Sequence, residues 1–155
     1  MQSYCDYPSP LGTIRIVEND AAIVRLALRP SAAPPADTVQ QETPLLREAA
    51  RQLDEYFARQ RSAFDLPLAP QGTPFQQKVW QTLRQIPYGQ TRAYKEIAAA
   101  IGCPKGCRAV GLANNRNPIA ILVPCHRVVG ADGKLVGYAG GLELKEKLLK
   151  LEGAR

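Results

Sequence analysis

The segment Pro67 to Gly72 divides this sequence into two parts whose apolar patterns differ. Two prolines and a glycine within six residues are typical of a connection, because they interrupt helices and central strands alike. Before this segment, β-branched runs typical of strands precede a single helical pattern, whereas after it apolar residues recur mainly at helical spacing. The chain has 155 residues, enough for one ordinary domain or two small ones. We therefore predict an α+β protein with domains at residues 1–68 and 69–155.

The first part has the pattern of a hairpin followed by a helix. Short β-branched runs, Ile14 to Val17 and Ala22 to Leu28, flank a polar turn and predict two antiparallel strands. A loop rich in Pro, Ala and Ser extends from Arg29 to Pro44, and apolar residues then recur at helical spacing from Leu45 to Phe57. Ala63 to Leu66 is predicted to return as a third strand.

The second part is mainly helical. Thr73 can cap a helix N-terminus, and Pro74 falls in the first turn, where a helix accepts proline. Further on, a helix is predicted from Thr91 to Ile101, Gly102 interrupts it, and a second run follows from Cys107 to Asn115. Two short helices joined by a turn that contains glycine are a candidate helix-turn-helix.

The second of these helices is narrow and basic. Ala109 and Gly111 keep it slim, Arg108 stands near its start, and Asn115 and Arg116 stand at its end. Glycine inside a helix costs up to ~1 kcal/mol relative to alanine, so Gly111 indicates that something approaches the backbone closely. A nucleic-acid groove and a neighbouring core helix both satisfy that requirement.

Charge favours an anionic partner. The chain carries 20 Lys and Arg against 14 Asp and Glu, a formal charge of +6. Basic proteins of this kind often bind nucleic acid. The N-terminus lacks the features of a signal peptide, and no apolar run is long enough for a membrane span. We expect a cytoplasmic protein, or a nuclear one in a eukaryote, with its four cysteines as free thiols.

The segment Pro124 to Arg127 combines a thiol, the only imidazole of the chain and a guanidinium. The apolar run from Ile119 to Val123 predicts a strand that ends at this segment. Cys125 is then either a buried, inert thiol or a nucleophile whose pKa His126 lowers. Successive side chains of a strand point to opposite faces, so we expect a water to relay the proton and a carboxylate to orient the imidazole.

Several motifs of the second part occur together in a known family. They are Pro124-Cys125-His126-Arg127, Asn117-Pro118, Arg108 to Gly111, Gly137 to Gly141 and Leu148 to Gly153. In order and spacing this set closely resembles the O6-alkylguanine-DNA alkyltransferases. The resemblance covers Thr73 to Gly153 and implies a ribonuclease H-like first domain and a winged helix-turn-helix in the second.

The resemblance also implies roles for five residues in the reaction. Cys125 would accept the alkyl group from O6 of guanine, His126 would take the thiol proton through a water, and Glu152 would orient His126. Asn117 would tie the acceptor segment to the helix-turn-helix, although a helix C-cap before proline explains it equally well. Tyr94 would donate to N3 of the extruded base and stabilise the leaving guanine.

The remaining implied residues would contact DNA or form the pocket. Arg108 would enter the duplex and fill the space of the flipped nucleotide, and the helix-turn-helix would bind the minor groove through Tyr94, Ala109, Gly111, Asn115 and Arg116. The base pocket would be lined by Val128, Tyr138, Ala139 and Gly140. Many relatives have serine where this chain has Ala139, so a hydroxyl contact to O6 is missing there. The implied partner is double-stranded DNA that contains O6-alkylguanine, bound by a monomer.

The chemistry implied is a single-turnover transfer, because water does not cleave a thioether. No cofactor is expected and no metal site, since the single histidine is assigned to the relay. Two other functions remain open. Cysteine, histidine and an acid also form the set of a cysteine hydrolase, and a non-catalytic protein that senses alkyl damage would share the DNA-binding helices.

Overall fold

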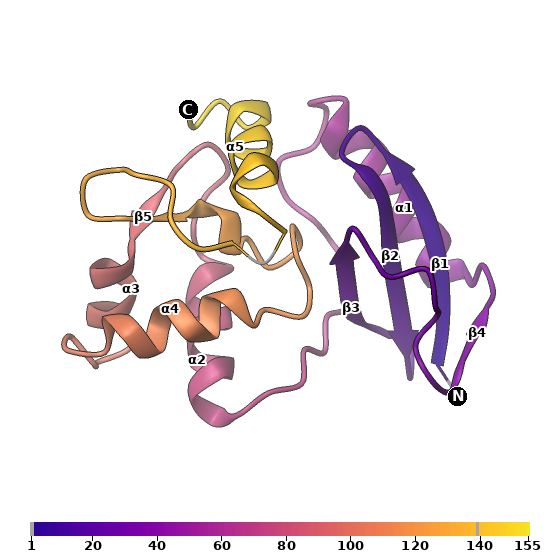
Figure 1. The fold of residues 1–155 in the computed structure, drawn as a ribbon. Helices are drawn as coiled ribbons and strands as arrows, with labels where there is room; N and C mark the ends of the chain where they lie inside the picture. The colour runs from indigo at the N-terminus through magenta and orange to yellow at the C-terminus, as the bar shows by residue number, and fades with distance from the viewer. Residues whose placement is uncertain (1, 139) are drawn as a thin grey trace. The chain divides into compact units, whose positions relative to one another are not determined.

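The computed structural model describes residues 2–138 and 140–155, which form two compact units. The first unit ends at Pro70 and the second begins at Gln71. Strands dominate the first unit and helices the second (Figure 1), which confirms the α+β class. In the part of the chain so described, no helix is long and apolar enough to cross a membrane.

The first unit contains a four-stranded sheet and one helix. Its elements are β1 (Gln2–Ser9), β2 (Gly12–Asn19), β3 (Ala22–Leu28), β4 (Thr38–Gln40) and α1 (Pro44–Phe57). The strand order is β3-β2-β1-β4; β1 pairs antiparallel with β2, β2 pairs antiparallel with β3, and β4 lies parallel to β1. The predicted hairpin of β2 and β3 is confirmed.

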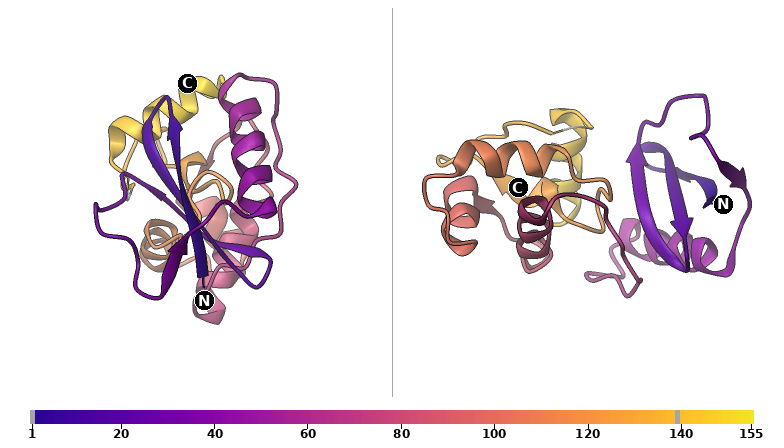
Figure 2. Two further views of the ribbon diagram at one scale, coloured as in Figure 1. Left: turned by 90° about the vertical axis from the view of Figure 1, so that its right-hand side faces the viewer. Right: turned by 90° about the horizontal axis from the view of Figure 1, so that it is seen from below.

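Helix α1 covers one face of this sheet (Figure 2). The hydroxyl of Thr43 caps it by accepting from the backbone N–H of Leu46, and Pro44 stands in the first turn. Leu46, Leu53 and Tyr56 are fully buried on the side that faces β1, β2 and β3. Their spacing of seven and three residues fits the helical period that predicted this helix.

The predicted third strand at Ala63 to Leu66 is wrong. Asp65 bonds through both backbone groups to the side chain of Gln52, its N–H to Oε1 at 2.9 Å and its C=O to Nε2 at 3.0 Å. Because a side chain takes these groups, they are not available for a sheet ladder. An isolated parallel bridge joins Ile23 of the sheet to Leu68, two residues beyond this stretch.

The second unit is built from short elements. They are α2 (Pro74–Leu83), β5 (Arg92–Ala93), α3 (Tyr94–Ala100), α4 (Cys107–Asn115), the 3-10 helix η1 (Cys125–Arg127), β6 (Val128–Val129) and α5 (Leu142–Leu151). Thr73 and Gln76 form a capping box at the start of α2, as the sequence predicts for Thr73. The indole N–H of Trp80 on α2 donates to the carbonyl of Ala113 on α4 at 2.9 Å, which fixes these two helices against each other.

Helices α3 and α4 are the predicted helix pair, with one change. The first helix begins at Tyr94 and not at Thr91, because Arg92 and Ala93 pair in parallel with β6. The second helix spans Cys107–Asn115, as predicted.

The predicted strand before Cys125 is also wrong. Residues 120–122 form turns, and Ile121 has a φ of 70°. The side chain of Asn117 bonds the backbone here, since its Oδ1 accepts from Ile119 N at 3.0 Å and its Nδ2 donates to Val123 O at 2.8 Å. Cys125 therefore lies at the start of a 3-10 helix and not at the end of a strand. The strand geometry that set Cys125 and His126 on opposite faces does not apply.

Candidate active site

Cys125 lies at the first position of η1, and side chains of neighbouring segments hold its backbone. Its carbonyl accepts from Nδ2 of Asn114, the penultimate residue of α4, at 3.3 Å. Asn117 fixes Val123 two residues earlier. The tie between α4 and the cysteine is thus made by Asn114, to which the sequence assigned no role at the cysteine, while Asn117 shapes the preceding turn. Asn114 is only 1% exposed, and a buried amide at the end of a helix indicates that its side chain hydrogen-bonds to a neighbouring segment.

Cys125 is buried, with 5% of its surface exposed. Burial raises its pKa, while the Asn117 amide, the charge of Lys145 and the Tyr138 hydroxyl act in the opposite direction. A thiol in such a site needs a base to form the thiolate, which is the nucleophile.

His126 and Glu152 supply a base and its orienting acid. Nε2 of His126 lies 2.8 Å from Oε2 of Glu152, and both side chains are fully buried. Burial would raise the pKa of Glu152, but hydrogen bonds from His126 and Arg127 outweigh it and lower that pKa to about 2. An ionised carboxylate only accepts, so Nε2 carries the proton and Nδ1 is the basic nitrogen. Among the described residues, Nδ1 has no hydrogen-bond partner.

Arg127 completes the set around Glu152. It donates from Nε to Oε1 at 2.8 Å and from Nη2 to Oε2 at 3.0 Å, and its Nη1 donates to Ile86 O at 2.7 Å. This bidentate pairing keeps the buried carboxylate ionised. Arg127 was not predicted to have a role, although a buried acid needs a cation nearby and Arg127 directly follows His126, the partner of that acid.

A second unpredicted cation is Lys145 of α5, which is fully buried. Its ammonium donates to Val136 O at 2.9 Å and to Gly137 O at 3.3 Å. It also lies 5.9 Å from the ring centroids of both Tyr94 and Tyr138. Burial lowers its pKa to about 8. Lys145 stands three and four residues before Leu148 and Leu149, so helical spacing places it on the apolar face of α5.

The predicted pocket residues surround this lysine in part. The Tyr94 hydroxyl donates to Val136 O at 3.1 Å. The Tyr138 hydroxyl is buried and has no hydrogen-bond partner among the described residues, and its pKa is raised by burial and by the neighbouring Cys125. Val128 is buried in β6 and Gly140 is half-buried. The expectation for Ala139 lies outside the described residues.

The predicted DNA-binding residues lie on α4 and its C-terminal cap, except Tyr94, which is half-buried at the start of α3. Arg108, Ala109, Asn115 and Arg116 are exposed. Among the described residues, a Cβ on Gly111 would meet the Tyr94 ring alone, with Cε1 at 3.8 Å, which is an ordinary contact. Packing within the protein therefore does not require glycine at position 111, and the alternative of a close neighbouring helix loses its support.

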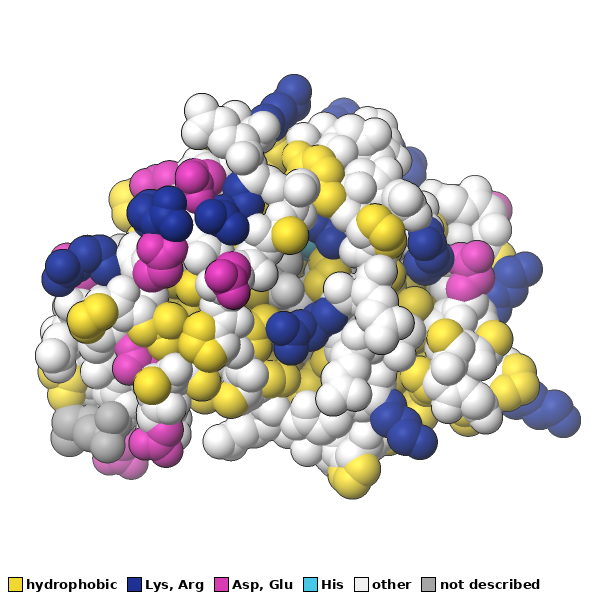
Figure 3. All heavy atoms as spheres, turned by 180° about the vertical axis from the view of Figure 1, so that it is seen from behind, with side chains coloured by type: hydrophobic (Ala, Val, Ile, Leu, Met, Phe, Trp, Pro, Cys, Tyr) yellow, Lys and Arg dark blue, Asp and Glu magenta, His cyan; other side chains and the backbone are white. Residues whose placement is uncertain are grey.

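The two units differ in charge. The residues up to Pro70 include seven Lys or Arg and nine Asp or Glu, which gives a net charge of −2. The residues from Gln71 onward include thirteen Lys or Arg and five Asp or Glu, which gives a net charge of +8. On the face in Figure 3, acidic side chains lie beside basic ones over the first unit. The positive field that would attract an anionic polymer thus belongs to the unit that contains α4 and Cys125.

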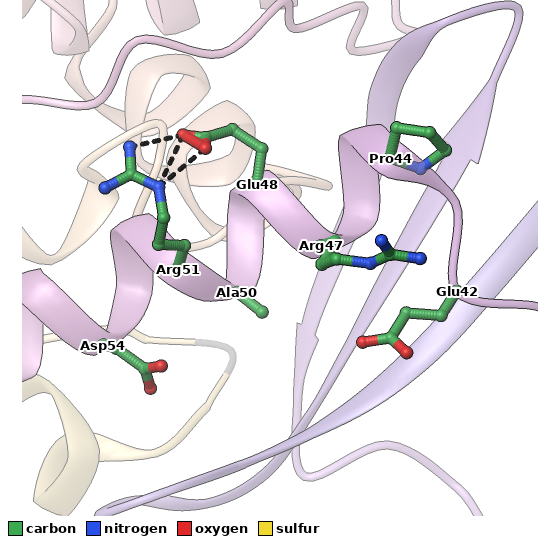
Figure 4. Close-up of a pocket in the computed structure, with 7 residues that line it drawn as sticks. All are labelled: Glu42, Pro44, Arg47, Glu48, Ala50, Arg51 and Asp54. Carbon is green, nitrogen blue, oxygen red and sulfur yellow. Dashed lines mark hydrogen bonds and ion pairs between the residues drawn. The ribbon is translucent and has the colours of Figure 1, made fainter.

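The first unit has a hollow of its own beside α1 (Figure 4). It is lined by Glu42, Pro44, Arg47, Glu48, Ala50, Arg51 and Asp54. Arg51 pairs with Glu48 at 2.6 Å, and the lining includes no cysteine or histidine. This hollow therefore lacks the nucleophile and base that lie together around η1.

Comparisons with known proteins agree with the geometry. Residues 74–154 match the DNA binding domain of 6-O-methylguanine DNA methyltransferase, and residues 3–70 match the ribonuclease-like domain of the same family. The chain is 55% identical over 147 residues to the methylated-DNA–protein-cysteine methyltransferase of Methanosarcina barkeri, covering 93% of this chain and 92% of the relative. It is 51% identical to the constitutive methyltransferase of that name from Bacillus subtilis, covering 98% and 96%. A crystal structure of Mycobacterium tuberculosis OGT in complex with DNA superposes with a TM-score of 0.92 at 44% identity, covering 98% of this chain and 93% of the other.

Proposed function

The chain belongs to the 6-O-methylguanine DNA methyltransferase family, and from this premise we propose that it repairs O6-alkylguanine in double-stranded DNA by moving the alkyl group to Cys125. The observation that carries the assignment is the buried Cys125 beside a His126–Glu152 pair whose outer nitrogen, Nδ1, is basic and unpartnered among the described residues. This arrangement can accept the proton of a thiol.

The first step is formation of the nucleophile. Nδ1 of His126 takes the Cys125 proton through a bridging water, and Glu152 stabilises the imidazolium that results. Because Arg127 keeps Glu152 ionised, the carboxylate is negative when the imidazole becomes positive. The thiolate sulfur then attacks the alkyl carbon, the bond from that carbon to O6 breaks, and the electron pair passes to the guanine.

The second requirement is a leaving group that can hold this charge. The Tyr94 hydroxyl bonds to Val136 O in the structure and would turn to donate to N3 of the base. Val128, Tyr138, Ala139 and Gly140 would line the base pocket. The product is a thioether, which water does not cleave, so each molecule reacts once and Cys125 is consumed.

In this proposal the exposed face of α4 binds the minor groove of the DNA. The protein acts as a monomer in the cytoplasm. O6 lies on the major-groove edge of the base, away from a protein in the minor groove, so the nucleotide has to rotate out of the duplex to reach Cys125, at a cost of a few kcal/mol. Arg108 is exposed near the start of α4 and would fill the space left behind. Gly111 supports a close approach of DNA, since the protein alone leaves room for a side chain there.

Intact-mass analysis after incubation with a duplex that contains O6-methylguanine tests this function. We expect one added methyl group per chain, on Cys125, and none on the variant Cys125→Ser, which should still bind the duplex. Cys103→Ser, an exposed thiol, is the matched control and should react like the unaltered protein. A methyl group on another cysteine would overturn the assignment. Release of free methanol would indicate a hydrolase, and an unchanged DNA would indicate a damage sensor.

A further inference from the structure

Lys145 is a buried cation for which the proposed reaction has so far given no purpose. Its three N–H donors meet two acceptors, Val136 O and Gly137 O. Among the described residues, no carboxylate lies within ion-pair distance of its ammonium. A buried charge without an opposite partner destabilises the fold, and a neutral side chain of similar length would avoid that cost.

The other charges of the site cancel one another. Arg127 and Glu152 form a bidentate pair at 2.8 and 3.0 Å. Burial lowers the pKa of His126, so its imidazole is neutral at rest. The site therefore has one uncompensated positive charge before the reaction, and it belongs to Lys145.

This charge lies where negative charge develops. The Lys145 ammonium interacts with the Cys125 thiol and lowers its pKa, and it lies 5.9 Å from the Tyr94 and Tyr138 rings. Cys125 carries the negative charge before transfer, and Tyr94 is proposed to contact the guanine that carries it afterwards. One fixed cation therefore lies near both positions.

We propose that Lys145 is the fixed counter-charge for the negative charge that moves from the Cys125 sulfur to the guanine during transfer. The inference rests on the proposed function and adds a residue to it. The thiol proton passes to Nδ1 of His126, the sulfur–carbon bond forms, the carbon–O6 bond breaks, and the guanine leaves with the electron pair. Lys145 keeps its proton throughout and acts through its field, which a dry site strengthens.

A pH profile distinguishes this role from a structural one. The titratable groups that face Lys145 are Tyr94 of α3, Cys125 and His126 of η1, and Tyr138 of the following loop. Since the pKa of Lys145 is lowered to about 8, its ammonium loses its proton above that pH while the thiol still gains charge. The single-turnover rate should rise towards neutral pH and fall again above about pH 8.

The variants are Lys145→Met, which removes the charge, and Lys145→Arg, which keeps it at every accessible pH. Lys147→Met is the matched control, because Lys147 is exposed on the same helix and pairs with Glu143 at 3.2 Å. We measure alkyl transfer to Cys125, as benzyl from the free base O6-benzylguanine and as methyl from a duplex that contains O6-methylguanine, between about pH 6 and about pH 10, together with thermal unfolding.

Lys145→Met should slow transfer roughly 100-fold on both substrates, and its transfer rate should no longer decrease at alkaline pH. Lys145→Arg should retain part of the transfer rate, and the decrease of this rate should begin at a higher pH. Lys147→Met should change neither the rate nor its pH dependence. An alkaline fall that persists in Lys145→Arg, or a rate in folded Lys145→Met equal to that of Lys147→Met, would overturn the proposal. If the unaltered protein gains no alkyl group on Cys125, the proposed function itself fails, which is a different outcome.

Discussion

At the scale of single residues, Glu152 links the proposed chemistry to the stability of the second unit. Its two carboxylate oxygens bond to His126 and Arg127, and its side chain is fully buried. Removing one partner of a buried ion pair typically costs ~3–5 kcal/mol, because the other charge remains unpaired. A substitution at Glu152 therefore affects both the relay and the fold.

We expect Glu152→Gln to lower the single-turnover rate roughly 100-fold, since general acid–base assistance is of that order, with a smaller loss of DNA affinity per folded molecule. The variant should also unfold at lower denaturant concentration, because Arg127 loses its anion. Glu143→Gln, exposed on α5, is the control and should change neither quantity. Parallel measurements of rate, binding and unfolding separate these effects, and an equal loss of rate and affinity would show a purely structural role.

The same residue predicts an acid-labile fold. The pKa of Glu152 is about 2 in the folded protein, against an ordinary value of 4.5. A lowered carboxyl pKa stabilises the fold above the ordinary value, and this stability is lost as pH falls from about 4.5 to about 2. The change is roughly 3 kcal/mol. Glu152→Gln should lack this component when the free energies of unfolding at neutral and acid pH are compared.

At the scale of elements, local sequence signals predicted helices α1 to α4 and the hairpin of β2 and β3, but not β1, α5 or the segments that depend on distant partners. Thr73 with Gln76 marks the start of α2, and the residues of α4 have their own helical pattern. By contrast, β4 exists because it pairs with β1, and the turn before Cys125 exists because Asn117 bonds the backbone. The apolar run from Ile119 to Val123 contains no local signal for this turn, because the turn depends on the side chain of Asn117.

The active site follows the same division. The motif around Cys125 pointed to the thiol, the imidazole and a remote acid, which the structure brings together in η1 and at the end of α5. Asn114, Arg127 and Lys145 were missed, because each has its role only through burial in the folded unit. A buried polar residue is recognised once its neighbours are known.

Helix α4 allows a test at this scale. Gly111→Ala should stabilise the free protein by up to ~1 kcal/mol, since alanine favours helix and its Cβ would make only an ordinary contact with Tyr94. The same methyl group should weaken binding to duplex DNA, if the groove approaches the helix at this point. Transfer from free O6-benzylguanine, which needs no duplex, should be unchanged. Lower stability without a change in DNA affinity would assign Gly111 to packing instead.

At the scale of the whole molecule, the net charges of −2 and +8 on the two units determine how salt affects the protein. DNA binding by Lys and Arg releases counterions, so log affinity falls linearly with log salt, with a slope close to the number of neutralised phosphates. We expect a steep slope for duplex binding and none for the reaction with the free base. A steep slope for both would mean that salt acts on the fold or the pocket.

Substitutions that remove one charge show which unit supplies this slope. Arg116→Gln, at the exposed C-terminal cap of α4, should lower the salt slope by about one and weaken binding similarly on all sequences. Arg25→Gln, exposed on β3 of the first unit, removes the same charge and should leave the slope unchanged. The measurement is the dissociation constant of each variant for one duplex over a range of salt concentrations. Equal reductions for both variants would mean that DNA responds to net charge alone, whereas a reduction confined to Arg116→Gln assigns the phosphate contacts to the unit that contains Cys125.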